Sequence, residues 1–192
     1  MQIATLDIET TSLRAVGDGV VLMAGIKPMG GAVKMLVWNP MESRPGHEDK
    51  LLQSIFDEVE KYDLIVMHNG ERFDWPYLKS RAMLLNMKRP KPPLVYDTML
   101  GAKRCGFRTT LNVIGKPTVA LDHLADFFGI PQEKTKIYPR VHWDIIWEAN
   151  FPAGIEAMRQ LVEHCAADVR MTEEVYWKII RNDPKPKIAY LA

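Results

Sequence analysis

The stretch that decides the fold lies near the start of the chain and reads Gln2-Ile3-Ala4-Thr5-Leu6-Asp7-Ile8-Glu9. Its alternating and then apolar pattern is typical of a β-strand, in which successive side chains point to opposite faces of a sheet. Asp7 and Glu9 therefore share a face, about 7 Å apart along the strand. Two carboxylates this close can reach one metal cluster, although an acid-x-acid pair alone is also common at the polar edge of a strand.

Patterns further along the chain predict the rest of an α/β fold. Apolar runs predict strands at residues 2–8, 20–26, 33–38, 64–67 and 94–96. Glycines in the connectors at 17–19 and 29–31 favour antiparallel hairpins between the first three strands. Helical periodicity predicts helices at 46–62, 74–85, 121–128 and 153–181. This order predicts a mixed five-stranded sheet, three antiparallel strands then two parallel, flanked by helices.

Length and composition favour one globular domain spanning residues 1–192, because 47% hydrophobic and 26% charged residues are ordinary values for a packed core. Cys105 and Cys165 have no short metal-type spacing, which favours a reducing, cytoplasmic compartment. The chain starts without a signal-peptide pattern and has no apolar run long enough for a membrane span, so we expect no membrane partner. A net charge of +1 argues against coating nucleic acid by bulk electrostatics but does not exclude a nuclease.

Further chemistry-bearing residues lie on two of the predicted helices. Asp74 opens a helix soon after the apolar strand 64–67, where α/β proteins tend to place their sites. Complementing the helix dipole is the ordinary use of such an acid. His164 and Asp168 are four residues apart on the last helix and so share one face, where a local hydrogen bond is the ordinary explanation. The combination and order of these elements, more than any one of them, indicate a site.

Taken together, the elements resemble the DEDD family of 3′→5′ exonucleases, which have a ribonuclease H-like fold. The matching segments are Leu6-Asp7-Ile8-Glu9-Thr10-Thr11, Asn69-Gly70-Glu71-Arg72-Phe73-Asp74-Trp75-Pro76-Tyr77-Leu78, and His164-Cys165-Ala166-Ala167-Asp168 with the following Val169-Arg170-Met171-Thr172. Tyr96-Asp97-Thr98-Met99 and residues 121–130 are similar as well. The resemblance covers nearly the whole chain and is closest to the proofreading exonuclease domains of family B DNA polymerases and to stand-alone bacterial or phage relatives.

The resemblance implies an enzyme that hydrolyses phosphodiester bonds from the 3′ end of single-stranded DNA and releases nucleoside 5′-monophosphates. It implies two divalent cations, Mg²⁺ or Mn²⁺, because hard oxygen ligands select such ions and because clustered carboxylates need compensating cations. Asp7 would bridge both ions, Glu9 and Asp168 would complete one site, and Asp74 would serve the other mainly through water. His164 would deprotonate or orient the attacking water.

The resemblance also implies a substrate site and partners. The residues implied at the terminal nucleotide are Thr10, Thr11 and Leu13, with Asn69 and Phe73 near the opposite side. The partners implied are a nucleic acid 3′ end and, in trans, a polymerase or another replication or repair protein, in a bacterial or phage-infected cell. Two basic stretches are candidate phosphate contacts, although solvated surface charge is the favoured interpretation of each: Lys103, Arg104 and Arg108 beside Phe107, and Lys134, Lys136 and Arg140 beside Tyr138.

One position departs from the family pattern and leaves the subtype open. Members with tyrosine usually place it four residues before the last acid, and members with histidine usually place it five before. This chain has His164 at the tyrosine spacing from Asp168. Three alternatives also stay open: an exoribonuclease that differs in contacts to the 2′-hydroxyl, a structure-specific endonuclease, and a non-catalytic nucleic-acid-binding subunit. The complete set of four acids argues against the last of these.

Overall fold

The computed structural model describes residues 1–88, 90–107, 119–132, 137 and 141–191. These residues form a mixed six-stranded sheet in the order β3-β2-β1-β4-β5-β6. The strands are β1 (Ile3–Thr10), β2 (Val21–Pro28), β3 (Lys34–Val37), β4 (Leu64–Met67), β5 (Leu94–Asp97) and β6 (Ala189–Tyr190). β1, β2 and β3 pair antiparallel, β1, β4 and β5 pair parallel, and β6 pairs antiparallel with β5.

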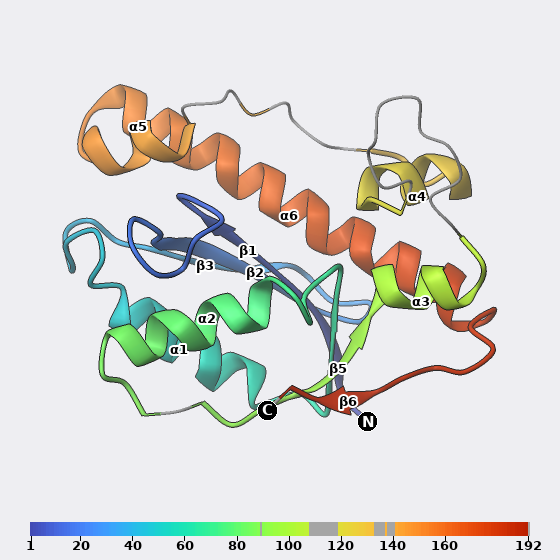
Figure 1. Ribbon diagram of the computed structural model, residues 1–192. Helices are drawn as coiled ribbons and strands as arrows, with labels where there is room; N and C mark the ends of the chain where they lie inside the picture. The colour runs from blue at the N-terminus through green and yellow to red at the C-terminus, as the bar shows by residue number, and fades with distance from the viewer. Residues whose placement is uncertain (89, 108–118, 133–136, 138–140, 192) are drawn as a thin grey trace.

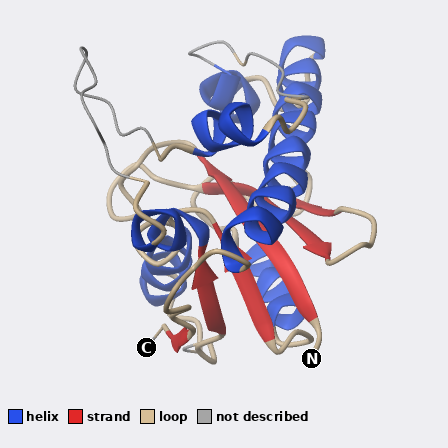
Figure 2. Ribbon diagram, turned by 90° about the vertical axis from the view of Figure 1, so that its right-hand side faces the viewer, coloured by secondary structure: helices blue, strands red, loops and turns tan. Residues whose placement is uncertain are grey.

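Helices cover both faces of this sheet. The helices of the described chain are α1 (Asp49–Val59), α2 (Asp74–Leu84), α3 (Thr98–Arg104), α4 (Leu121–Phe128), α5 (Val141–Trp147) and α6 (Pro152–Ile180). α1 and α2 lie on one side of the sheet, whereas α6 crosses the other side. α5 packs against the N-terminal part of α6, and α4 packs toward its C-terminal part (Figure 1). A view turned by 90° shows the strands as a twisted layer between helices (Figure 2).

The predicted α/β architecture is confirmed, with three additional elements. The structure has the five predicted strands and four predicted helices, although several ends shift by a few residues. β6 extends the predicted five-stranded sheet to six strands, and its two residues are too few to carry a pattern. α3 and α5, of seven residues each, were not predicted either. α3 starts directly after β5 because the side chain of Asp97 caps it, accepting a hydrogen bond from Leu100 N at 3.1 Å.

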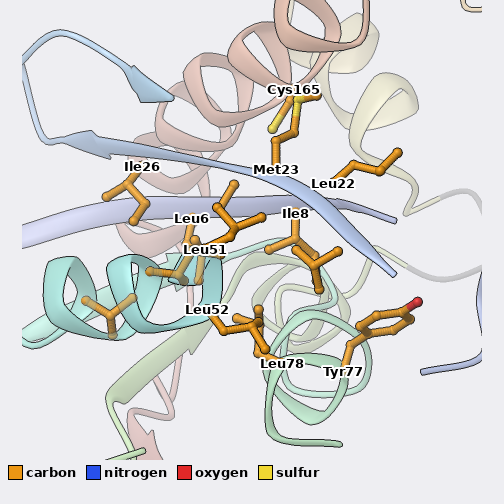
Figure 3. Close-up of a cluster of buried hydrophobic side chains, with 14 of the residues drawn as sticks. Leu6, Ile8, Leu22, Met23, Ile26, Leu51, Leu52, Tyr77, Leu78 and Cys165 are labelled. Atoms are coloured by element: carbon orange, nitrogen blue, oxygen red, sulfur yellow. The ribbon is translucent and has the colours of Figure 1, made fainter. Parts of the chain in front are cut away.

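Alternation along β1 decides which residues reach the core and which reach the site. Leu6 and Ile8 are buried on the face that α1 and α2 cover, where they pack with residues such as Leu52 and Leu78 (Figure 3). The odd-numbered residues face α6, and the hydroxyl of Thr5 donates to the carbonyl of Val169 at 3.1 Å. The acids Asp7 and Glu9 are therefore directed at α6 by the same alternation that builds the core.

α6 comes close to the sheet at a glycine. Gly25 of β2 stands opposite Asp7 in the strand register. A Cβ at Gly25 would lie 3.1 Å from Cys165 Sγ and 3.1 Å from Val169 Cγ1. The missing side chain therefore lets α6 settle against β1 and β2 beside the first acid.

α6 also joins the two buried clusters of the fold. Its 29 residues span roughly 44 Å. Leu161 and Cys165 belong to the cluster around β1, whereas Val175 and Ile179 belong to a second cluster with Tyr96 of β5. Within the described ranges, no helix has the length and apolar character needed to cross a membrane.

Candidate active site

Asp7 lies under α6 in the middle of the site. Cys165, which is fully buried, places its Sγ 3.6 Å from Asp7 Oδ2 and 3.7 Å from the Asp7 carbonyl oxygen. Burial and the neighbouring carboxylate of Asp7 raise the pKa of the Cys165 thiol well above its usual value. The thiol therefore keeps its proton at neutral pH and donates to Asp7. Cys165 was not among the predicted site residues, although it lies between His164 and Asp168 in the matching motif.

Asp74 joins the start of α2 to the end of β1. Its side chain is only 3% exposed, and Oδ1 accepts a hydrogen bond from Ile8 N at 3.1 Å. Ile8 is the residue between the two β1 acids. This one contact holds the α2 carboxylate beside both of them.

The α6 residues complete the group. His164 Nε2 lies 3.9 Å from Asp168 Oδ2 and 3.9 Å from Glu9 Oε1. The side chains of His164, Glu9 and Asp168 are each 13–15% exposed, so solvent reaches a mostly buried cluster. The structure thus brings together all five predicted catalytic residues: Asp7, Glu9, Asp74, His164 and Asp168.

The electrostatics of the cluster call for a cation. Burial, followed by the charges of Asp74, Glu9 and Asp168, raises the pKa of Asp7 well above its usual range. Burial also raises the pKa of Asp74 to about 7, assisted by Asp97 and Glu9 and opposed by the Ile8 N–H. Ligand atoms of Asp7, Glu9 and Cys165 lie within 4.8 Å of one another. Because most of the donors are hard carboxylate oxygens and their charges repel, the residues fit a divalent cation such as Mg²⁺ or Mn²⁺.

Asp97, at the end of β5, orders the loop that leads to Asp74. The carboxylate of Asp97 is 1% exposed and accepts from Asn69 N at 3.2 Å and from Glu71 N at 3.1 Å. Asn69 has a φ of 65°, in the left-handed region that asparagine tolerates better than most residues. Asp97 was not among the predicted site residues, although Tyr96-Asp97-Thr98-Met99 was part of the resemblance and Asp97 ends the parallel strand next to β4.

The predicted substrate-binding residues lie on two segments beside the acids. Thr10 Oγ1 donates to the Ser12 carbonyl at 2.9 Å, and Thr11 Oγ1 donates to the Asp18 carbonyl at 3.1 Å. Both threonine hydroxyls therefore shape the loop after β1, on which Leu13 is 85% exposed.

The second segment carries Asn69 and Phe73. The ring of Phe73 lies 5.4 Å from the ring of Tyr77, and a Cβ at Gly19 would lie 2.2 Å from Tyr77 Oη. Tyr77 thus packs between Phe73 and the loop after β1. All five predicted substrate residues lie on these two segments. Their role in binding the terminal nucleotide stays a prediction.

The candidate phosphate contacts have a mixed outcome. Arg104 Nη2 lies 2.7 Å from Asp183 Oδ2, and its guanidinium lies 5.6 Å from the centre of the Tyr96 ring. Arg104 therefore forms a structural ion pair at the C-terminal end of α3, whereas Lys103 is exposed. The remaining predicted contacts lie outside the described residues: Arg108, Lys134, Lys136, Tyr138 and Arg140.

A second histidine, which the sequence patterns did not single out, also reaches the acids. His142 on α5 places its Nε2 3.6 Å from Glu9 Oε2. α5 was not predicted, and an isolated histidine has no spacing that relates it to the acid motifs. Only the packing of α5 against α6 reveals the contact.

An antiparallel three-stranded unit continued by parallel strands, with acids from the first strand and from helices on both faces, defines the ribonuclease H-like class of α/β proteins. The model of the RNase_H superfamily matches residues 4–180, and the chain belongs to this superfamily. This match confirms the predicted superfamily. The polymerases among the relatives described next confirm the predicted relation to family B DNA polymerases.

Named relatives include polymerases and a bacterial protein. The chain is 28% identical to DNA polymerase 2 of Aeropyrum pernix over 192 residues, which cover 90% of this chain and 22% of that protein. It is 30% identical to the uncharacterized protein YprB of Bacillus subtilis over 129 residues, covering 64% of this chain and 31% of YprB. The family B DNA polymerase of Pyrobaculum calidifontis has a similar fold, with a TM-score of 0.68 and 20% identity over 93% of this chain and 24% of that one. The chain thus spans less than a third of the length of these relatives.

Proposed function

We propose that the protein is a metal-dependent 3′→5′ exonuclease that removes nucleoside 5′-monophosphates from the 3′ end of single-stranded DNA. Membership of the RNase_H superfamily supports a hydrolase that acts on nucleic acid. The observation that carries the finer proposal is the convergence of four acids from β1, α2 and α6, with His164 between Glu9 and Asp168. This arrangement combines a multi-carboxylate centre with a side chain able to accept a proton.

The four acids would hold two divalent cations, Mg²⁺ or Mn²⁺. Asp7 is the central ligand, because it lies beside Cys165 of α6 and the charges of the other three acids all act on it. Glu9 and Asp168 lie toward His164, whereas Asp74 lies toward the backbone of Ile8. When bound, the ions would neutralise the charge of the scissile phosphate and stabilise the leaving 3′-oxygen.

The protein side chains would orient the water and move its proton. The oxygen of a water molecule attacks the phosphorus of the terminal nucleotide while the bond from phosphorus to the 3′-oxygen of the preceding nucleotide breaks. His164 Nε2 takes the proton of the water, and the leaving oxygen takes a proton from solvent. The products are a nucleoside 5′-monophosphate and a chain shortened by one nucleotide that ends in a 3′-hydroxyl.

The test is digestion of a single-stranded oligonucleotide labelled at its 3′ or 5′ end, with and without Mg²⁺ or Mn²⁺. We expect immediate release of the 3′ label as a mononucleotide and a shortening ladder from the 5′-labelled strand. Matched RNA and circular DNA substrates identify an exoribonuclease or an endonuclease, either of which would overturn the proposal.

Substitution of the central acid links the activity to this site. Asp7→Asn should lower the rate at least about 100-fold. The neutral amide would hold the cations less tightly, and the cations neutralise the charge of the scissile phosphate. Asp57→Asn is the matched control, since Asp57 is exposed on α1, away from the acids, and accepts a hydrogen bond from Gln53 of the same helix. Equal activity of the Asp7→Asn and Asp57→Asn proteins would place the chemistry elsewhere.

A further inference from the structure

His142 brings a second imidazole to the acids, and the proposed mechanism gives it no role. His142 Nε2 lies 3.6 Å from Glu9 Oε2, closer than the 3.9 Å that separates His164 Nε2 from Glu9 Oε1. The side chain of His142 is 22% exposed, so it lies at the rim of the cluster and is not part of the apolar core.

α5 holds His142 in place by burying the residues around it. Val141 and Ile145 are both 0% exposed and belong to the cluster that contains Ile8 of β1 and Leu161 of α6. Figure 1 shows α5 packed beside the N-terminal part of α6, the helix that carries His164. Because its neighbours are anchored in the core, the imidazole of His142 approaches Glu9 from a fixed backbone.

Glu9 has particular need of such support. The pairing of β1 with β2 shifts register between Glu9 and Thr10, so the regular pairing of the two strands is interrupted directly after Glu9. A glutamate has three rotatable side-chain bonds, and ordering a long flexible side chain costs conformational entropy. The two histidines face different oxygens of the same carboxylate, one from α5 and one from α6. Together they restrict the plane in which Glu9 presents its oxygens.

We propose that His142 is a positioning residue that holds Glu9 ready for metal binding through a contact from Nε2 to Oε2, an inference that rests on the proposed function of the site. A small closing movement turns the 3.6 Å contact into a hydrogen bond, in which an imidazole with its proton on Nε2 donates to the carboxylate. Partners that orient a ligating side chain typically change metal affinity or activity 10–100-fold when they are removed.

The test compares Mn²⁺ dissociation constants of the full chain, measured from the electron paramagnetic resonance signal of free Mn²⁺. His142→Ala should weaken Mn²⁺ binding about tenfold. His142→Gln should restore most of the affinity, because its amide nitrogen can donate from nearly the same place as Nε2. His123→Ala is the matched control, since His123 is exposed on α4. A Mn²⁺ affinity of His142→Ala within about twofold of wild type, or His142→Gln as weak as His142→Ala, overturns the proposal.

Turnover against Mn²⁺ concentration separates positioning from a direct chemical role. His142→Ala should approach the wild-type kcat at saturating Mn²⁺ with an unchanged KM for the oligonucleotide, whereas His164→Ala should stay slow at every concentration. A kcat of His142→Ala that stays low at saturating Mn²⁺ overturns the positioning role.

The Mn²⁺ measurement does not depend on nuclease activity. If the wild-type protein degrades no oligonucleotide while Mn²⁺ binding still requires His142, the exonuclease proposal fails and the positioning of Glu9 stands. If degradation requires Asp7 while His142→Ala binds Mn²⁺ normally, the exonuclease proposal stands and the role of His142 fails.

Discussion

At the scale of single residues, the site without a cation disfavours the ionised form of two of its carboxylates. Asp74 is buried and Asp7 is half-buried, each beside other acids, and burial is the largest cause of the raised pKa of each. A carboxylate in this position opposes folding when ionised and unpaired. The same repulsion is relieved when a cation enters, so the strain at these residues is a reason to expect metal binding and not a defect of the fold.

The raised pKa of Asp74, caused mainly by burial, predicts how the stability of the metal-free protein depends on pH. Asp74 loses its proton near 3.8 in the unfolded chain but near 7 in the folded protein. Between these values the folded state binds more protons, so the Asp74 contribution to stability is fully present below the lower value and is lost as pH rises through the upper one. In chelator, the unfolding temperature should therefore fall from about pH 4 to about pH 8, by roughly 10 °C from this group.

The Asp74→Asn protein isolates that contribution. Its side-chain oxygen can still accept from Ile8 N, but it does not titrate. The difference in unfolding temperature between wild type and Asp74→Asn, measured across the same pH range, should grow in favour of the variant as pH rises. A difference that does not change with pH would show that Asp74 titrates alike in both states.

At the scale of elements, a buried ion pair fixes α2 against the loop after β1. Arg81 of α2 and Glu48 are 2% and 0% exposed, and Arg81 Nε and Nη2 lie 2.6 and 3.0 Å from the two oxygens of Glu48. Arg81 Nη1 also donates to the Ala15 carbonyl at 3.2 Å, and Glu48 accepts from Val21 N at 3.2 Å. This one ion pair therefore joins α2, the loop after β1, the start of β2 and the segment that precedes α1.

Removal of the arginine should be costly for this reason. Arg81→Met leaves the Glu48 carboxylate buried without its cation, which typically costs about 3–5 kcal/mol, or about 10 °C in unfolding temperature. The double variant Arg81→Met with Glu48→Gln should recover part of that loss, because the uncompensated charge is gone. Thermal unfolding of both proteins measures the coupling, and additive losses in the double variant would mean that the pair does not act as a unit.

The elements also show how far sequence patterns extend. The five strands and α6 were predictable because alternation and helical periodicity are local properties of segments such as 2–8 and 153–181. β6 was not, because two residues become a strand only by pairing with β5. The grouping of Asp7, Glu9, Asp74 and Asp168 followed from motif order and resemblance, whereas the contact of His142 depends on how α5 packs on α6. Whether these residues act as proposed stays a prediction.

At the scale of the whole molecule, the proposed metal ligands tie together distant parts of the chain. Asp7 and Glu9 come from the first strand, Asp74 from the helix on one face of the sheet, and Asp168 from the helix on the other. α6 in turn contributes to both buried clusters. Occupation of the acidic cluster by a cation should therefore stabilise the fold as a unit, because the unfolded chain cannot hold these four side chains together.

This coupling predicts a thermal shift that needs no nucleic acid. A cation that binds only the folded state adds about 2.7 kcal/mol at 100 times its dissociation constant, which is about 5–10 °C for a chain of this size. Wild type should gain this increment in Mg²⁺ or Mn²⁺ at neutral pH, and Asp7→Asn should lose most of it. In chelator Asp7→Asn should be the more stable of the two proteins, because the substitution removes a half-buried charge that three other acids repel. Calorimetry of both proteins with and without metal measures all four states, and an equal metal increment in the two proteins would show that the cation binds away from Asp7.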